Sequence, residues 1–232
     1  MLPSKVERSE FMTSLLAHDI SNYNQTSRGY LEMLLDEQMG PLSDEQSRAL
    51  TICLRQSGRI QSLIESVRLI DELEETAPRL EAADLDPAIQ NAVAQVQTAF
   101  ADREVRVRFT PGARRVVSEG HLQTIFRHLI SNAARHNDAE VVEVDIEVAH
   151  ADDSSPYVIS IRDNGAGIAP SRQADLFDRL DRLAVHGSGL GLPLVKLLVE
   201  RCGGRVWLDP SPGPGTVIRI ELPATAEEAK HE

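Results

Sequence analysis

The sequence has few aromatic residues, few cysteines, a shortage of positive charge and no long apolar run. Phe, Tyr and Trp make up 4% of the 232 residues, so a core must be built mainly from Leu, Ile, Val and Ala. The 24 Lys and Arg residues face 36 Asp and Glu residues, for a net charge of −12. Because nucleic-acid binding needs clustered positive charge, we expect no nucleic acid among the partners.

The cysteines and the hydropathy pattern narrow the class of protein further. Cys53 and Cys202 are far apart in apolar surroundings and fit no metal-ligand spacing, so we expect both to be reduced, buried thiols. The sequence has no run of about 18 apolar residues and no signal peptide. We therefore expect no membrane segment in this chain and a cytoplasmic location, with a longer or membrane-associated parent protein as the open alternative.

Two heptad patterns predict a helical hairpin in the first third of the chain. Alternating steps of three and four residues predict helices over residues 5–37 and 44–75. The first seam consists of Leu16, Ile20, Tyr23, Ser27, Tyr30 and Leu34, and the second of Leu50, Cys53, Ser57, Ile60, Ile64 and Val67. Ser43 and Gln46 predict a capping box at the start of the second helix. Because a lone hairpin cannot cover both seams, we expect a homodimer in which two hairpins form a four-helix bundle.

The rest of the chain mixes helices and strands without strict alternation. The patterns predict helices over residues 87–101, 119–136 and 188–202, and strands over 105–109, 142–148, 157–162, 206–208 and 217–222. This order favours an α+β two-layer sandwich over a doubly wound parallel sheet. We therefore expect a hairpin domain over 1–75, a linker over 76–84, an α+β domain over 85–223 and a polar tail over 224–232.

Four short blocks in the second domain occur in a fixed order. They are HLISNAARHN (128–137), DNGAGI (163–168), GSGLGL (187–192) and GPGTVIRIELP (213–223). In this order and spacing they resemble the ATP-binding domain of sensor histidine kinases, in the ATPase group that also includes Hsp90, type II topoisomerases and MutL. Upstream, FMTSLLAHDISNYNQ (11–25) resembles the phosphoacceptor box of the same kinases. The resemblance covers nearly the whole chain and implies an ATP-dependent protein-histidine kinase.

Helical geometry and the resemblance agree on the histidine in the first helix. His18 lies about 200° around the helix from Leu16, so it should face solvent rather than the seam. Asn22 follows one turn later on the same face. The resemblance implies that His18 accepts the phosphoryl group, that Asp19 orients its ring and accepts its proton, and that Asn22 places water for dephosphorylation. A lone surface histidine would be the ordinary reading without that resemblance.

The resemblance also implies the residues of an ATP and Mg²⁺ site. Asn132 would ligate Mg²⁺, Asp163 would accept a hydrogen bond from the adenine amine, and Thr216 would support Asp163. The resemblance further assigns phosphate contacts to Arg135 and His136, close backbone approach to Gly165 and Gly167, and a phosphate loop to Gly187, Ser188, Gly189, Leu190 and Gly191. In the segment between Phe177 and Gly187, Arg182 and Arg179 either reach the γ-phosphate or are surface charges.

These assignments predict autophosphorylation of His18 and transfer to an aspartate on the receiver domain of a response regulator, with regulator phosphatase activity as a further expectation. Cis and trans transfer within the dimer both stay open. One rival is an ATP-driven conformational machine of the Hsp90 and MutL kind. It is disfavoured because those proteins carry a Glu general base four residues before the Mg-binding Asn, where this chain has His128. The other rival is a decayed scaffold, disfavoured by the presence of Asn132 and Asp163.

His128 is also where the sequence departs from the kinases, which usually carry Asn at this position. One helical turn separates His128 from Asn132, so its ring should point toward the metal and the triphosphate. We therefore expect autophosphorylation at saturating ATP to vary with pH between about 5.5 and 7.5, near the ordinary imidazole range. The alternative is that His128 turns aside and packs against the sheet.

Overall fold

A computed structural model describes residues 5–150, 155–174, 176–177, 190–209 and 214–225, with side chains from residue 18 onward. The chain divides into two compact units, Met1–Ala77 and Pro78–Glu232. Over the described ranges, no helix is both long enough and apolar enough to cross a bilayer.

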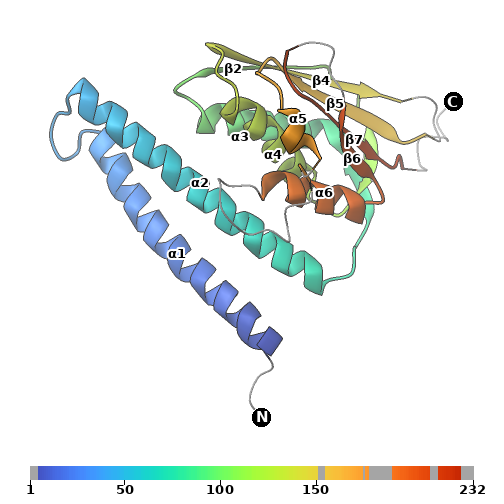
Figure 1. Cartoon of the computed structure of the whole chain (residues 1–232), viewed down its shortest axis with the longest axis horizontal. Helices are drawn as coiled ribbons and strands as arrows, with labels where there is room; N and C mark the ends of the chain where they lie inside the picture. The colour runs from blue at the N-terminus through green and yellow to red at the C-terminus, as the bar shows by residue number, and fades with distance from the viewer. Residues whose placement is uncertain (1–4, 151–154, 175, 178–189, 210–213, 226–232) are drawn as a thin grey trace. The chain divides into compact units, whose positions relative to one another are not determined.

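The first unit is a hairpin of two long helices (Figure 1). Helix α1 spans Lys5–Leu35 and α2 spans Asp44–Glu75, close to the predicted bounds. The predicted capping box is confirmed, because the Gln46 N–H donates to Ser43 Oγ at 3.2 Å and the Ser43 N–H donates to Gln46 Oε1 at 2.8 Å. The intervening loop turns at Gly40, whose φ of 115° falls in the left-handed region open to glycine.

Helix α1 packs against α2 through a different face from the predicted first seam. Tyr23 and Tyr30 are 73% and 57% exposed. Asn24 is buried instead, where its Nδ2 donates to the Ser57 carbonyl at 3.0 Å and its Oδ1 accepts from Ser57 Oγ at 2.9 Å. This polar pair satisfies itself only when the helix is turned so that Asn24 faces α2. The prediction that Cys53 is buried is also wrong, because it lies exposed on α2.

In its described residues, the second unit contains three longer helices, a five-stranded sheet and three short elements (Figure 1). The helices are α3 (Leu85–Ala99), α4 (Leu122–Arg135) and α6 (Gly191–Arg201). The sheet strands are β2 (Glu104–Phe109), β4 (Val141–Ala149), β5 (Tyr157–Asp163), β6 (Arg205–Asp209) and β7 (Val217–Leu222). The short elements are β1 (Glu81–Asp84), β3 (Arg115–Ser118) and α5 (Pro170–Gln173).

Two predicted boundaries need correction. The expected linker over residues 76–84 contains β1, which pairs antiparallel with β3. Helix α4 begins at Leu122 and not at residue 119, because Gly120 adopts a φ of 85° that a helix does not allow. The expected helix over 188–202 is α6, which begins at Gly191, while residues 188 and 189 lie outside the described residues.

The sheet is mixed and one of its faces is covered by helices, which confirms the α+β prediction. The strand order is β2-β4-β5-β7-β6, with β2 and β4 parallel and the other pairs antiparallel. Figure 1 shows α3, α4 and α6 on one side of this sheet. The largest fully buried side chains include Phe126 of α4, Ile159 of β5 and Leu194 of α6. The core therefore lies between one helical layer and one sheet layer.

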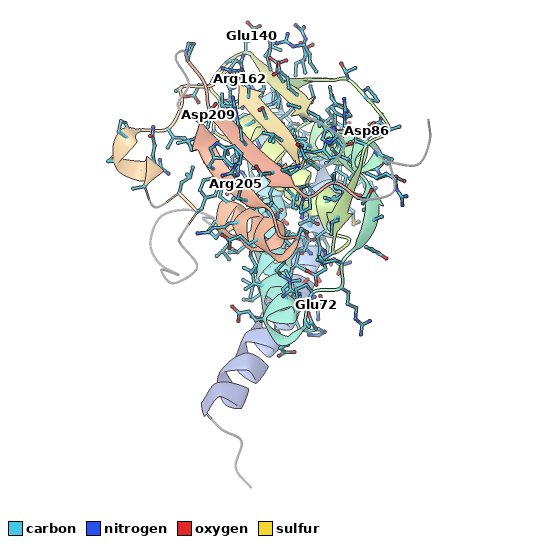
Figure 2. All side chains as sticks on the ribbon, turned by 90° about the vertical axis from the view of Figure 1, so that its right-hand side faces the viewer. Glu72, Asp86, Glu140, Arg162, Arg205 and Asp209 are labelled. Carbon is cyan, nitrogen blue, oxygen red and sulfur yellow. The ribbon has the colours of Figure 1, made fainter. Side chains whose placement is uncertain are left out.

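Ion pairs join the edge strand β6 to its neighbour β7. Figure 2 labels Arg205 and Asp209, which stand at the two ends of this strand. Arg205 pairs with Glu221 at 2.8 Å, and Asp209 pairs with Arg219 at 2.8 Å, both across to β7. The Arg205 guanidinium also lies 4.9 Å from the centre of the Trp207 ring. Charged side chains on an edge strand disfavour pairing with another chain.

Candidate functional site

A cavity of about 300 Å³ lies beside α4, at the point where β5 ends and α6 begins. Its apolar lining comes from Leu129, Ala133, Ile161, Ile168, Leu176, Leu192 and Ile218. Its polar lining comes from Asn132, His136, Asp163, Arg172 and Thr216. An apolar cavity with a few convergent polar groups suits a small organic ligand that also carries charge.

Asp163 is held in one orientation by the backbone around it. It is the last residue of β5, and its Oδ1 accepts the Gly165 N–H at 2.8 Å and the Thr216 N–H at 3.1 Å. Its own N–H donates to the Thr216 carbonyl at 3.0 Å. These bonds use only one carboxylate oxygen, so the other can accept a hydrogen bond from an amine in the cavity. The predicted support by Thr216 comes from its backbone.

Gly215 allows the backbone to pass close behind Asp163. A Cβ atom at Gly215 would lie 2.0 Å from the Asp163 carbonyl oxygen, and the φ of Gly215 is 101°. Both observations restrict this position to glycine. The glycine therefore lets the loop before β7 bring the Thr216 N–H against the carboxylate.

Asn132 and His128 converge on the first residue of α6. A Cβ atom at Gly191 would lie 3.2 Å from His128 Nδ1 and 3.9 Å from both the nitrogen and the oxygen of the Asn132 amide. The missing side chain thus leaves bare backbone beside two polar groups, at the N-terminus of an 11-residue helix. This cradle, bordered by the cavity, suits the close approach of an anionic group or its counterion.

His128 is buried and neutral, which contradicts the ordinary imidazole pKa on which the expected pH dependence of autophosphorylation rested. Its side chain does not line the cavity, and its residue is 8% exposed. Burial, together with the nearby charges of Arg127 and Arg135, lowers the pKa of His128 to about 3. Within the described part of the chain, its Nε2 has no hydrogen-bond partner. The imidazole therefore acts at neutral pH as an uncharged group facing Gly191.

The other predicted site residues take various places. Gly167 lines the cavity with Gly191, whereas Gly165 lies behind Asp163 and acts through its N–H. Leu190 is buried, and its carbonyl accepts the Leu194 N–H at 3.0 Å in the first turn of α6. Arg135 lies at the end of α4 but does not line the cavity. Arg179, Arg182, Gly187, Ser188 and Gly189 fall outside the described residues.

Sequence reasoning missed one charged residue at the cavity. Arg172 lies on α5, the four-residue helix that follows the DNGAGI turn, and it lines the cavity. Pro170 at the start of this helix was a usable signal, because proline is favoured in the first helical turn. A cation placed just after the glycine turn is suited to a negatively charged ligand.

The three predicted residues of the hairpin lie together on the exposed side of α1. The His18 side chain is 66% exposed and the Asp19 side chain 51% exposed. His18 Nδ1 lies 3.1 Å from Asp19 Oδ1 and 3.4 Å from Asn22 Nδ2. Both contacts involve the same ring nitrogen, so the carboxylate can accept a proton from Nδ1 while Nε2 keeps its lone pair.

Comparisons with known proteins identify a matching family and several relatives. Residues 117–226 match the family described as Histidine kinase-, DNA gyrase B-, and HSP90-like ATPase. The chain is 28% identical over 240 residues to the cell-division control histidine kinase PdhS of Brucella ovis. It is 23% identical over 216 residues to cyanobacterial phytochrome A of Nostoc sp.. These alignments cover 94% and 91% of this chain but 23% and 28% of the relatives, so the chain spans about a quarter of their length.

Solved structures share the fold. The mycobacterial sensor histidine kinase MprB matches with a TM-score of 0.52 and 29% identity, over 62% of this chain and 98% of that one. AdeS of Acinetobacter baumannii matches with a TM-score of 0.54 and 22% identity, over 87% of this chain and 95% of that one. ShkA in complex with AMPPNP matches with a TM-score of 0.60 and 22% identity, over 93% of this chain and 46% of that one. Residues 117–226 therefore form a domain of this ATPase family, and histidine kinases are among the relatives and solved structures that the chain resembles.

Proposed function

We propose that this chain transfers the γ-phosphoryl group of ATP to His18, and from there to an aspartate on the receiver domain of a response regulator. The observation that carries the proposal is the 3.1 Å contact between His18 Nδ1 and Asp19 Oδ1 on an exposed helical face. It occurs on a chain whose second unit matches the ATPase family and contains a cavity suited to a nucleotide.

In this proposal, the contact at Nδ1 leaves Nε2 as the imidazole nitrogen that reacts. When Nδ1–H donates to Asp19, the lone pair lies on Nε2, and this nitrogen attacks the γ-phosphorus. A bond forms between Nε2 and phosphorus, the bond from phosphorus to the bridging oxygen breaks, and ADP leaves with that electron pair. The Asp19 carboxylate accepts the Nδ1 proton, so the product is an uncharged phosphoimidazole ring.

The cavity residues would bind the nucleotide. In this proposal Asp163 accepts a hydrogen bond from the adenine amine, and Leu129, Ile161 and Ile218 pack against the base. The phosphates interact with the positive charge of Arg172 and with the N-terminus of α6 at Gly191. Catalysis then depends mainly on positioning and on charge neutralisation, as in other phosphoryl transfers.

The donor set beside the cavity fits Mg²⁺. Asn132 offers an amide oxygen, a hard ligand of the kind this ion prefers, and the open backbone at Gly191 leaves room beside it. Where side chains are described, no group of three His, Cys, Asp or Glu residues is arranged to hold an ion. Asn132 would therefore hold Mg²⁺ together with oxygens of the triphosphate. When bound, the ion offsets negative charge on the phosphates.

The apolar surface of the hairpin supports a homodimer as part of the proposal. The exposed apolar side chains on α1 and α2 include Ile20, Tyr23, Tyr30, Met33, Ile52, Ile60 and Leu63. Exposed apolar side chains in this number on one hairpin indicate an interaction surface, and a second copy would complete a four-helix bundle. Sedimentation at micromolar concentration should give twice the 25.6 kDa mass of one chain.

A second activity, dephosphorylation of the regulator, is favoured by the position of Asn22. Its amide nitrogen lies 3.4 Å from His18 Nδ1, one helical turn away on the same exposed face. An amide in this place can hold a water molecule near a phosphoaspartate docked at His18.

Labelling with ATP tests the proposed function. The chain is incubated with γ-labelled ATP and Mg²⁺, and the labelled protein is then treated with acid or with base. Phosphohistidine is labile in acid and stable in base, so we expect the label to follow this pattern. An acid-stable label, or none, would contradict the proposal, and α-labelled ATP serves as the control for tightly bound nucleotide.

A further inference from the structure

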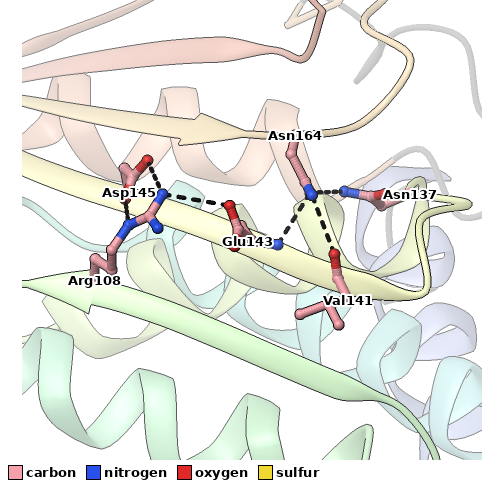
Figure 3. A network of polar contacts seen from close by, with 6 residues as sticks. All are labelled: Arg108, Asn137, Val141, Glu143, Asp145 and Asn164. Carbon is pink, nitrogen blue, oxygen red and sulfur yellow. Dashed lines mark hydrogen bonds and ion pairs between the residues drawn. The ribbon is translucent and has the colours of Figure 1, made fainter.

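Two asparagine side chains join the end of α4 to the turn that follows β5 (Figure 3). Asn137 Nδ2 donates to Asn164 Oδ1 at 2.6 Å. Asn137 stands two residues beyond the end of α4, and Asn164 follows Asp163 directly. The contact therefore connects the two walls of the cavity, because Asn132 and His136 come from α4 and its C-terminus, and Asp163 from β5.

Asn164 extends the pairing of the sheet by one step through its side chain. The pairing of β4 with β5 ends at Val144 and Asp163. Beyond it, Asn164 Oδ1 accepts the Glu143 N–H at 3.0 Å, the Asn164 N–H donates to the Glu143 carbonyl at 3.3 Å, and Asn164 Nδ2 donates to the Val141 carbonyl at 3.1 Å. The side-chain amide thus replaces a peptide group while the main chain turns away into the glycine turn.

Asn137 is fixed just as firmly from the other side. It is 2% exposed, and its Oδ1 accepts the Ala139 N–H at 2.9 Å. The Arg103 guanidinium donates to the carbonyls of Ala134, Asn137 and Ala139 at 2.9, 2.9 and 2.8 Å. These carbonyls belong to the last turn of α4 and the loop after it, where helices leave carbonyls without partners. The position of Asn137 relative to α4 is therefore set by Arg103.

We propose that Asn137 and Asn164 are positioning residues that fix the Asp163 carboxylate relative to α4 and so determine selectivity for adenine. This rests on the proposed function, in which Asp163 reads the adenine amine. The backbone bonds to Asp163 from Gly165 and Thr216 orient the carboxylate within its own loop. The asparagine pair fixes the position of that loop relative to α4, which forms the opposite wall of the cavity. Neither asparagine lines the cavity, so both act through Asp163.

The test compares two nucleotides that differ at the group that Asp163 would read. Inosine triphosphate carries an oxygen in place of the adenine amine, and its affinity is measured beside that of ATP by calorimetry on the full chain. We expect the wild type to prefer ATP. In Asn164→Ala and in Asn137→Ala, the preference should fall by about tenfold, the equivalent of one hydrogen bond to a charged group. Inosine triphosphate affinity should stay near the wild-type value.

Two controls separate positioning from a general loss of structure. Arg108→Ala removes the exposed guanidinium that binds Asp145 and Glu143 in the same network (Figure 3), and it should leave the preference unchanged. The double variant Asn137→Ala/Asn164→Ala should lose no more preference than Asn164→Ala alone, because both substitutions remove the same contact. If Asn164→Ala fails to fold, Asn137→Ala still tests the proposal, since it leaves the Asn164 bonds to β4 in place.

The results that would overturn the positioning role differ from those that would overturn the proposed function. The positioning role would be overturned if the asparagine variants lost affinity equally for ATP and for inosine triphosphate. It would also be overturned if both variants kept the wild-type preference for ATP. Asp163→Asn should abolish the preference whatever the asparagines do. If the wild type shows no preference for ATP, or Asp163→Asn retains it, the adenine assignment itself is wrong and the positioning proposal is overturned with it.

Discussion

The Asp163 carboxylate accepts the backbone N–H of Thr216 at 3.1 Å, from the loop that opens the neighbouring strand β7. The contact is fixed by backbone geometry, and it leaves the second carboxylate oxygen for a ligand. We predict that Asp163→Asn weakens ATP binding by one to two decades, since a hydrogen bond to a charged group is worth about 1.5–3 kcal/mol. Calorimetric titration of the full chain with Mg·ATP measures this change.

Thr216→Val is the matched control for that variant. It keeps the backbone N–H that orients Asp163 and removes only the hydroxyl of a residue that lines the cavity. ATP affinity should therefore fall less in Thr216→Val than in Asp163→Asn. A larger fall in the threonine variant would place the recognition of the ligand on the hydroxyl and not on the carboxylate.

The buried imidazole of His128 should make the stability of the second unit depend on pH. Its pKa is lowered to about 3 in the folded chain, mainly by burial, against about 6.5 in the unfolded chain. Between these values the unfolded chain binds a proton that the folded chain does not, so stability is complete above pH 6.5 and falls as pH decreases. At pH 5 the loss should be about 2 kcal/mol relative to pH 7.5.

His128→Asn should remove this part of the pH dependence. Trp207 is the only tryptophan and lies on β6, so its fluorescence in urea reports unfolding of the second unit. The wild type and the variant are compared at pH 5 and pH 7.5, which cancels the contributions of the other titrating groups. An equal pH dependence in the two proteins would contradict the burial of a neutral His128.

A nearly buried ion pair should stabilise the second unit where α6 ends. Arg201 donates to Glu119 through Nε at 2.7 Å and through Nη2 at 2.6 Å, and the two side chains are 13% and 11% exposed. The hydrogen bond from Arg201 lowers the pKa of Glu119, so its contribution is present above the ordinary Glu pKa and is lost as pH falls through the lowered value.

Glu119→Gln removes the carboxylate charge that Arg201 binds, and we predict a loss of about 3 kcal/mol in the free energy of unfolding at pH 7. Glu104→Gln is the control, because the Glu104 and Arg106 side chains are more than half exposed and such pairs contribute less than about 1 kcal/mol. Urea titration followed by Trp207 fluorescence gives both values. Similar losses in the two variants would show that burial adds nothing to the Arg201 pair.

The helices of this fold were largely predictable, whereas some of their contacts were not. The periodicity over residues 44–75 and the capping box at Ser43 are local signals, and both were confirmed. The predicted seam of α1 does not identify the face that packs on α2 within one chain, because apolar residues occupy two neighbouring stripes of the helix. Only the contact between Asn24 and Ser57 identifies the packed stripe. The strands β1 and β3 have four residues each, too few to show a period.

The site residues that belong to sequence motifs were predictable, whereas the properties that depend on burial were not. Asp163, Gly191 and Thr216 stand in recognisable blocks, and the structure brings them to one cavity. The lowered pKa of His128 arises from side chains that close over it in three dimensions, which helical spacing from Asn132 does not reveal. Asn137 lies within the first block, but its contact with Asn164 joins residues 27 positions apart and depends on the turn after β5.

The position of Asn22 leads to a prediction that separates two activities. Its amide lies beside the His18 ring but contacts Nδ1, the nitrogen opposite the one that would be phosphorylated. Asn22→Ala should therefore retain autophosphorylation and lose dephosphorylation of the regulator. Autophosphorylation is measured with γ-labelled ATP, and dephosphorylation is measured with a regulator that is labelled on its aspartate. Equal loss of the two would indicate that Asn22 maintains the helix face around His18 and has no separate role.

The assignment of His18 as the phosphoacceptor is tested most directly by labelling three proteins with γ-labelled ATP: the wild type, His18→Gln and His121→Gln. His121 is the matched control, because it precedes α4 in the second unit and makes no side-chain capping bond. We predict an acid-labile label on the wild type and on His121→Gln and none on His18→Gln. ATP affinity of His18→Gln should stay within about twofold of the wild type, since the residue makes no contact expected to bind nucleotide. Residual acid-labile labelling of His18→Gln would contradict the assignment of His18 as the phosphoacceptor.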